Sequence, residues 1–305
     1  STPIKSSAAS DVYKRQIMRR WYMSAGVTPY SFVGYYFKSS QELEGSPGTF
    51  VTSTFSGTGG LSKAFLSQGF SLTKHLSVGM NLNFIFGNMT QNEIQSAMTV
   101  SREMSGRSFY ADFGLQYHRP IARETFLTVG AIYGYKQRIS LKNTVTVTGS
   151  STETPYNQKR VTQYLPQYIG IGSSLAHKKW TYALDYLFRQ YGVLNSGDSR
   201  VKFRDSHELR LGVCYFPNGF SSSSYWKRRS YKAGVSVSTP YLRLKGQSGG
   251  AYRVSVGLGL PVLNGRINTA FYYDRLQLQG NALRRDIMGF TVTYTLSEKF
   301  YQVKL

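Results

Sequence analysis

Large apolar residues recur at alternate positions along this chain, with small, polar or charged residues between them. Residues 180–189 are the clearest example, with apolar side chains at Trp180, Tyr182, Leu184, Tyr186 and Phe188. Residues 76–86 and 252–260 repeat the alternation. Because successive side chains of a β-strand point to opposite faces, each segment is predicted to form a strand with one apolar face and one small or polar face. Segments of about ten residues with this pattern, repeated along a chain, are typical of a membrane-spanning β-barrel.

The positions of these segments predict the order of strands and connections. Strands are expected near residues 20–28, 30–41, 48–57, 61–71, 75–87, 107–118, 125–138, 160–175, 179–191, 206–216, 230–243, 250–261, 265–277 and 286–296. Short turns are expected at 73–75, 247–250 and 264–265, and longer polar connections at 42–48, 89–106, 149–159, 192–204 and 217–227. Residues 149–159 have the composition of a solvated loop, whereas the run from Met89 could hold a helical turn or a further strand.

Short turns at one end and longer loops at the other are typical of outer-membrane barrels. We therefore predict an all-β fold, a transmembrane antiparallel up-and-down β-barrel of about 14 strands that could be incomplete at its N-terminus. A soluble β-sandwich also alternates apolar and polar faces and is the main alternative. Two observations favour the barrel: the second face of residues 233–238 is rich in Gly and Ser, and no linker divides the chain into two domains.

The composition agrees with a barrel in lipid. The chain has 24 Tyr and 18 Phe, and barrels place such rings in girdles at the two membrane interfaces. No run of 18 apolar residues predicts a transmembrane helix. The single cysteine, Cys214, excludes an internal disulfide framework and a cysteine-cluster metal site. No cofactor and no metal are expected.

The formal charge of +22 has two interpretations. Clustered Lys and Arg can bind nucleic acid, but here the basic residues are spread over strand ends and loops, and no nucleic-acid-binding motif accompanies them. No nucleic-acid partner is expected. Basic rims that face anionic headgroups fit the pattern better, with outer-membrane lipid and lipopolysaccharide as partners.

The N-terminus has a different origin from the rest of the chain. Residues 6–16 read SSAASDVYKRQ, which is the translation of a transposase adapter used to build sequencing libraries. We therefore interpret residues 1–16 as a non-native, adapter-derived segment and residues 17–305 as the outer-membrane β-barrel domain. The gene is expected to be truncated before Ile17, so that a signal peptide and the first part of the barrel are missing.

Several stretches resemble the Bacteroidota branch of the FadL-like outer-membrane proteins, the family of the long-chain fatty-acid transporter. They are WYMSAGVTPYSFVGYYF (21–37), GTGGLSKAFLSQGFSLTKHLSVGMNLNFIFGNM (57–89), YWKRRSYKAGVSVSTPYLRL (225–244), GLGLPV (257–262) and FTVTYTLSEKFYQVKL (290–305). The resemblance implies a multi-pass barrel in the outer membrane of a Gram-negative cell. It also implies an N-terminal hatch in the lumen and passive transport of hydrophobic small molecules, fatty-acid-like or aromatic. The hatch motif is absent, so no ligand-contact residue can be transferred from the family.

A second hypothesis is a structural or assembly barrel of a secretion or surface-attachment system, with secretion machinery as its partner and no substrate of its own. An apolar pocket in the lumen would favour transport. A filled lumen with an exposed hydrophobic side or loop patch would favour assembly.

An outer-membrane hydrolase is the third and weakest hypothesis. Asp205 and His207 share a strand face, as do His75 and Ser77, and such pairs occur in barrel proteases and deacylases. A base beside a nucleophile must be oriented by a third group, and the sequence identifies none. We therefore expect no catalytic residues and a protein that is not an enzyme.

Charged residues in the middle of strands are predicted to face the lumen, because an unpaired charge in hydrocarbon costs about 2–4 kcal/mol. There they would pair across strands or line a polar path. The lumen-facing candidates are Asp112, Asp185, Arg189, Glu208, Arg210, Arg253 and Asp274. Proline removes a hydrogen bond from a strand ladder, so Pro240 is a candidate for a strand kink that opens a lateral gate.

Overall fold

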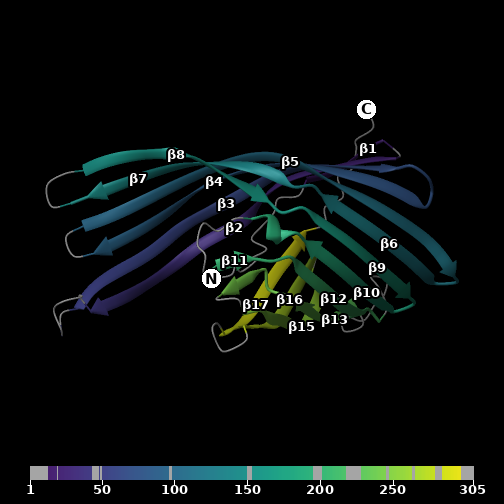
Figure 1. The fold of residues 1–305 in the computed structure, drawn as a ribbon. Coiled ribbons are helices and arrows are strands. Elements are labelled where there is room, and N and C mark those ends of the chain that lie inside the picture. Colours follow the sequence, from purple (N-terminus) through teal and green to yellow (C-terminus); the bar gives the residue numbers. More distant parts are fainter. Residues whose placement is uncertain are drawn as a thin grey trace. The chain divides into compact units, whose positions relative to one another are not determined.

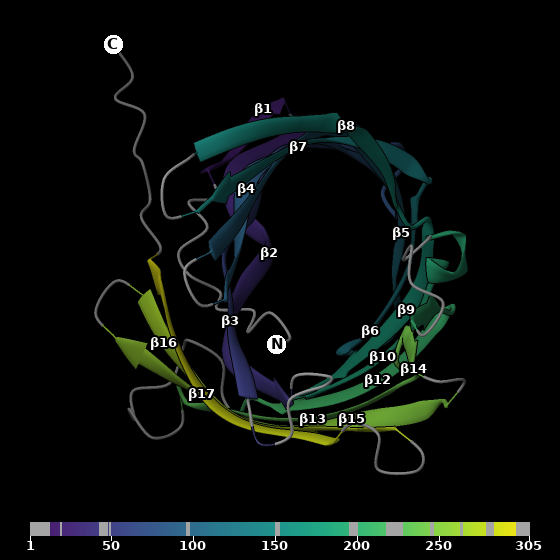
Figure 2. The same cartoon turned by 60° about the vertical axis from the view of Figure 1, so that its left-hand side comes forward.

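The fold is all-β in the computed structural model, which describes residues 13–18, 20–42, 48, 50–95, 98–149, 153–194, 201–217, 228–244, 247–262, 265–278 and 284–296 (Figures 1 and 2). Every strand pairing for which a register is defined is antiparallel, as predicted. The described residues contain no helix long and apolar enough to cross a membrane. Residues 1–12 of the expected adapter segment and residues 297–305 lie outside the described part of the chain.

The chain divides into two compact units, and the first consists of Ser1–Phe70, Gly79–Asp112 and Lys136–Leu165. It contains β1 (Tyr13–Met18), β2 (Trp21–Glu42), β3 (Phe50–Ser71), most of β4 (Leu76–Gln95), the first part of β5 (Met98–Ala122), β7 (Gln137–Thr148) and β8 (Glu153–Leu165). Strands β1 to β5 are neighbours in sequence order, and β7 pairs with both β5 and β8. Strands β2 to β5 have 20–25 residues each, about twice the ten or so that a bilayer requires.

The second unit consists of Ser71–Val78, Phe113–Tyr135 and Pro166–Leu305. Its main strands are β6 (Thr125–Gly134), β9 (Tyr168–His177), β10 (Trp180–Arg189), β12 (Ser206–Tyr215), β13 (Ser230–Ser238), β15 (Gly249–Val262), β16 (Gly265–Leu278) and β17 (Arg284–Leu296). They pair in that order (Figure 1). A 3-10 turn, η1 (Tyr191–Val193), and a two-stranded sheet of β11 (Val201–Phe203) and β14 (Leu242–Leu244) lie in the connections.

The cross-strand register of unit 2 keeps the apolar positions on one face. Leu184 pairs with Ser173 and Leu211, and Leu211 continues the row to Val235 and Val254. The apolar side chains of this face are exposed, most strongly on β17. Antiparallel partners lie on the same face of a sheet, so the predicted alternation holds across strands as well as along them.

Two predicted strand breaks are wrong. β2 and β3 each form one continuous strand where the sequence predicts two. The interruption at Pro29 is a β-bulge, because the register with β3 shifts between Pro29 and Ser31. In β3 the glycines do not end the strand, since Gly59 adopts a φ of 106°, which a glycine reaches without strain.

The predicted loop at residues 149–159 is also wrong, because β8 begins at Glu153. Of the two alternatives for the run after Met89, a further strand is correct: β4 continues to Gln95 and β5 starts at Met98. The β7–β8 hairpin carries Thr and Val in alternation at residues 144–148 and mostly polar residues beyond them. A search for alternating large apolar residues therefore does not detect it.

One face of unit 1 carries a small buried core. Ile85 of β4 is fully buried, and Leu61, Tyr110 and Ile139 from neighbouring strands are nearly so. Gly106 of β5 leaves the space for this packing. A Cβ atom there would lie 2.8 Å from Leu141 and less than 4 Å from Ile139 and Leu61.

We expect Ile85→Val to lower the free energy of unfolding by about 1 kcal/mol, because it removes a buried methyl group and leaves a small cavity. Ile94 of the same strand is 44% exposed, so Ile94→Val is the matched control and should change stability by less than about 0.5 kcal/mol. Urea unfolding of the refolded protein measures both. Equal losses would contradict the packed environment of Ile85.

Candidate functional site

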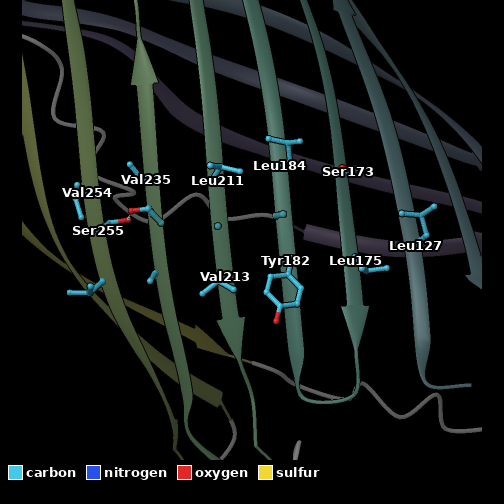
Figure 3. A pocket seen from close by; sticks show the side chains of 15 residues that line it. Leu127, Ser173, Leu175, Tyr182, Leu184, Leu211, Val213, Val235, Val254 and Ser255 are labelled. Atoms are coloured by element: carbon cyan, nitrogen blue, oxygen red, sulfur yellow. Dashed lines mark hydrogen bonds between the residues drawn. The ribbon is translucent and has the colours of Figure 1, made fainter. Parts of the chain in front are cut away.

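A shallow concavity of about 580 Å³ opens on the apolar face of unit 2 (Figure 3). Its lining residues come from six strands: Leu127, Ser173, Leu175, Tyr182, Ala183, Leu184, Leu211, Gly212, Val213, Ala233, Gly234, Val235, Val254, Ser255 and Val256. Most of them belong to two neighbouring rows of cross-strand partners. One row is Ser173, Leu184, Leu211, Val235 and Val254, and the other is Leu127, Leu175, Tyr182, Val213, Ala233 and Val256. Each row has one small member, Ser173 or Ala233, among Leu, Val and Tyr. The concavity therefore arises where a small side chain interrupts an apolar surface.

The opposite face of unit 2 carries ion pairs that link strands. Glu208 of β12 accepts hydrogen bonds from Arg189 of β10 at 3.2 Å and from Arg210 at 2.7 Å. Asp185 is the cross-strand partner of Arg210 and adds to its electrostatic stabilisation. Charge-assisted hydrogen bonds of this kind are stronger than neutral ones, so they hold β10 and β12 together.

A second ion-pair group lies further along the same face. Arg253 of β15 contacts Asp274 of β16 at 2.5 Å, and Arg285 of β17 approaches the same carboxylate at 3.9 Å. The Arg253 guanidinium also lies 5.2 Å from the ring centre of Tyr272. Cross-strand pairing, one of the two uses expected for these charges, is thus observed for Arg189, Glu208, Arg253 and Asp274. That this face lines a lumen stays a prediction.

Asp112 lies in unit 1, on β5, and not among the ion-paired residues of unit 2. Its carboxylate is buried and accepts hydrogen bonds from Asn81 at 2.5 Å and Asn83 at 2.8 Å. The two asparagines satisfy both carboxylate oxygens, so this cluster cross-links β4 and β5. The asparagine partners were not predictable from the sequence, because their contact with Asp112 depends on the register of the two strands.

Pro240 is buried and lies two residues beyond the end of β13, in the connection to β14. It therefore removes no hydrogen bond from the main sheet. Its role in a gate stays a prediction. The adjacent Tyr241 stacks on Tyr191 of η1 with ring centres 4.6 Å apart, and burial raises the pKa of the Tyr191 hydroxyl.

The side chains considered for hydrolysis have other partners. His75 contacts the backbone oxygen of His118 through Nδ1 at 3.0 Å, and Ser77 shares a hydrogen bond with Ser71. Asp205 accepts a hydrogen bond from the backbone of Gly192. His207 bonds through Nδ1 to the hydroxyl of Tyr186 at 2.7 Å. Within the described ranges, no group of three or more His, Cys, Asp or Glu side chains could hold a metal ion.

Aromatic side chains gather where β9 and β10 meet in a tight turn. Trp180 lies 4.5 Å from Tyr215 and 6.2 Å from Tyr182 between ring centres, and Tyr215 lies 6.4 Å from Tyr231. This cluster joins three adjacent strands, and its place in an aromatic girdle at a membrane interface stays a prediction. Its position next to the concavity was not predictable, because it depends on the pairing of β10, β12 and β13.

Comparisons with known structures agree on the fold. The chain is similar to the CymD monoaromatic hydrocarbon channel at 13% identity and a TM-score of 0.57, over 95% of this chain and 82% of that one. It is similar to the toluene transporter TbuX of Ralstonia pickettii at 14% identity and a TM-score of 0.58, over 93% and 78%. A FadL homologue of Pseudomonas aeruginosa matches at 11% identity and a TM-score of 0.55, over 87% and 69%.

At these identities the likeness shows the fold alone, which is that of the FadL-like outer-membrane barrels, as the sequence resemblance predicted. The comparison with curated proteins gives no match. The family model named BamG matches residues 16–304, nearly the whole chain. This protein therefore belongs to the BamG family.

Proposed function

We propose that this protein is an outer-membrane β-barrel with a structural or assembly role, and that it does not conduct a substrate of its own. The observation that carries the proposal is the placement of polar and apolar surface in unit 2. The concavity opens on the apolar face, whereas Glu208, Asp274 and their arginine partners occupy the other face.

The placement matters because a path for hydrophobic molecules needs an apolar lining. A ring or acyl chain that passed along the ion-paired face would remove water from charged groups without replacing their hydrogen bonds, which is unfavourable. The exposed apolar face has no such obstacle. It offers a large surface to lipid or to the hydrophobic belt of another membrane protein.

Deletion of the gene in its host tests the proposal. We expect reduced amounts of other outer-membrane or surface-attached proteins, measured by quantitative proteomics of the outer-membrane fraction, with unchanged entry of oleate and toluene. Complementation with the wild-type gene should restore the protein levels. A normal outer-membrane proteome together with slower entry of either compound would contradict the assembly role.

A second candidate function is passive transport of hydrophobic small molecules, fatty-acid-like or aromatic. The likeness in fold to CymD, TbuX and a FadL homologue, over most of this chain, favours it. If the protein is a transporter, the ion-paired face would line only part of the path that a hydrophobic molecule takes through it. The alternative requires saturable uptake that depends on the protein.

A further inference from the structure

The concavity on the apolar face has the form and chemistry of a groove for an acyl chain. Ser173 and Ala233 are small members of its lining, and the larger lining side chains are aliphatic apart from Tyr182; Ser255 is the other polar residue (Figure 3). An acyl chain that is already in hydrocarbon gains no transfer energy there, so its attraction to such a surface comes from van der Waals contact between its methylene groups and the lining side chains. A flexible hydrocarbon chain can follow a shallow depression that spans several strands.

The groove leads to the aromatic cluster of Trp180, Tyr215 and Tyr231, because Tyr182 belongs to both. Rings of this kind favour the membrane interface, where an apolar body meets a polar rim. The groove therefore crosses several strands and borders the aromatic cluster at Tyr182, three residues from the β9–β10 turn.

That turn consists of Lys178 and Lys179, both exposed. The backbone N–H of Lys178 donates a hydrogen bond to the carbonyl of Glu124 in the β5–β6 turn. Among the described residues, Glu124 is the only acidic side chain at this end of unit 2. The basic ones are Lys74, Arg119, Arg123, Lys178, Lys179, Arg228, Arg229, Lys232 and Arg266.

We propose that unit 2 binds an anionic phospholipid, with one acyl chain in the groove and the phosphate at Lys178 and Lys179. Lys179 precedes Tyr182 by three residues, or about 10 Å along a strand, which matches the span from a headgroup to the upper acyl chain. Tight turns mark the periplasmic end of outer-membrane barrels, so the occupant is a phospholipid of the inner leaflet and not lipopolysaccharide. This lipid site requires that the protein lies in the outer membrane. It goes beyond the proposed assembly role and does not depend on that role.

Native mass spectrometry of the full chain in detergent tests the site, with palmitoyl-oleoyl phosphatidylglycerol, palmitoyl-oleoyl phosphatidylethanolamine and lipid A as separate probes. We expect one phosphatidylglycerol to be retained in preference to the other two. Removing one lysine near a membrane surface should weaken binding about fivefold, so Lys178→Gln with Lys179→Gln should weaken it roughly 25-fold. Lys74→Gln, in the exposed β3–β4 turn, is the matched charge control and should bind normally.

The groove is tested separately by filling it. Ala233→Leu should reduce phosphatidylglycerol retention about tenfold, because the larger side chain takes up the space of the acyl methylenes and removes their van der Waals contacts. Ala131→Leu adds the same atoms to the same apolar face outside the groove and should have no effect. Retention that is unchanged in both groove and lysine variants, preferential retention of lipid A, or a second copy of the chain in place of lipid would each overturn the proposal. The gene-deletion experiment tests the assembly role and not the lipid site, so the two proposals can fail separately.

Discussion

Leu184→Arg should prevent stable insertion of the protein into a membrane. Leu184 lies in the middle of β10 on the apolar face, with its cross-strand partners Ser173 and Leu211. An arginine on the lipid face costs about 2–4 kcal/mol near the bilayer midplane, a large fraction of the stability of a small membrane domain. Heat-modifiable migration on gels and recovery in the membrane fraction measure the loss of folded protein.

Ala183→Arg is the matched control, one residue away on the opposite face. Ala183 pairs with Ser174 and Gly212, which leave room for a longer side chain and place it near the ion-paired surface. This variant should insert normally. Equal insertion of the two variants would contradict the assignment of the faces, and a greater defect for Ala183→Arg would show that the faces have been assigned in reverse.

Glu208→Gln should produce the second large effect, a loss of about 2 kcal/mol of folding free energy. The substitution removes the carboxylate that accepts hydrogen bonds from both Arg189 and Arg210. Breaking a fully buried pair costs about 3–5 kcal/mol, and the smaller figure allows for solvent screening, because Arg210 is 42% exposed while Glu208 is 17% exposed. Equilibrium folding into phospholipid vesicles, followed by tryptophan fluorescence, measures the change.

A double-mutant cycle separates pairing from other effects of the substitution. Arg189→Gln alone and Arg189→Gln with Glu208→Gln complete the cycle, and we expect a coupling energy of about 1 kcal/mol. Coupling near zero would mean that the contact between these two side chains does not stabilise the sheet.

The sequence was sufficient to predict the strands that carry large apolar residues. In β10 and β12 the alternation is strict, so both strands and their faces were predicted closely. The β7–β8 hairpin was missed because polar residues occupy positions that a membrane strand would fill with apolar ones. β2 was divided at Pro29 because a bulge that tolerates proline cannot be distinguished from a turn without the partner strand.

The candidate site was only partly predictable, because its features depend on register between strands. Alternation placed Glu208 and Arg189 on the polar face, but their contact requires β10 and β12 to pair with Arg189 opposite Ser206. The groove likewise requires Ser173 and Ala233, which are distant in sequence, to stand in adjacent rows of one surface. No local signal in either strand encodes that proximity.

The most direct test of the proposed role is uptake of oleate and toluene by cells of a Gram-negative host that lacks its own FadL-type channel. The protein is expressed in the outer membrane, and its folding is verified by heat-modifiable migration. If the ion-paired face does not conduct hydrophobic molecules, uptake should equal that of cells with an empty vector. A saturable increase in the uptake of either compound would contradict the structural role and establish the protein as a channel.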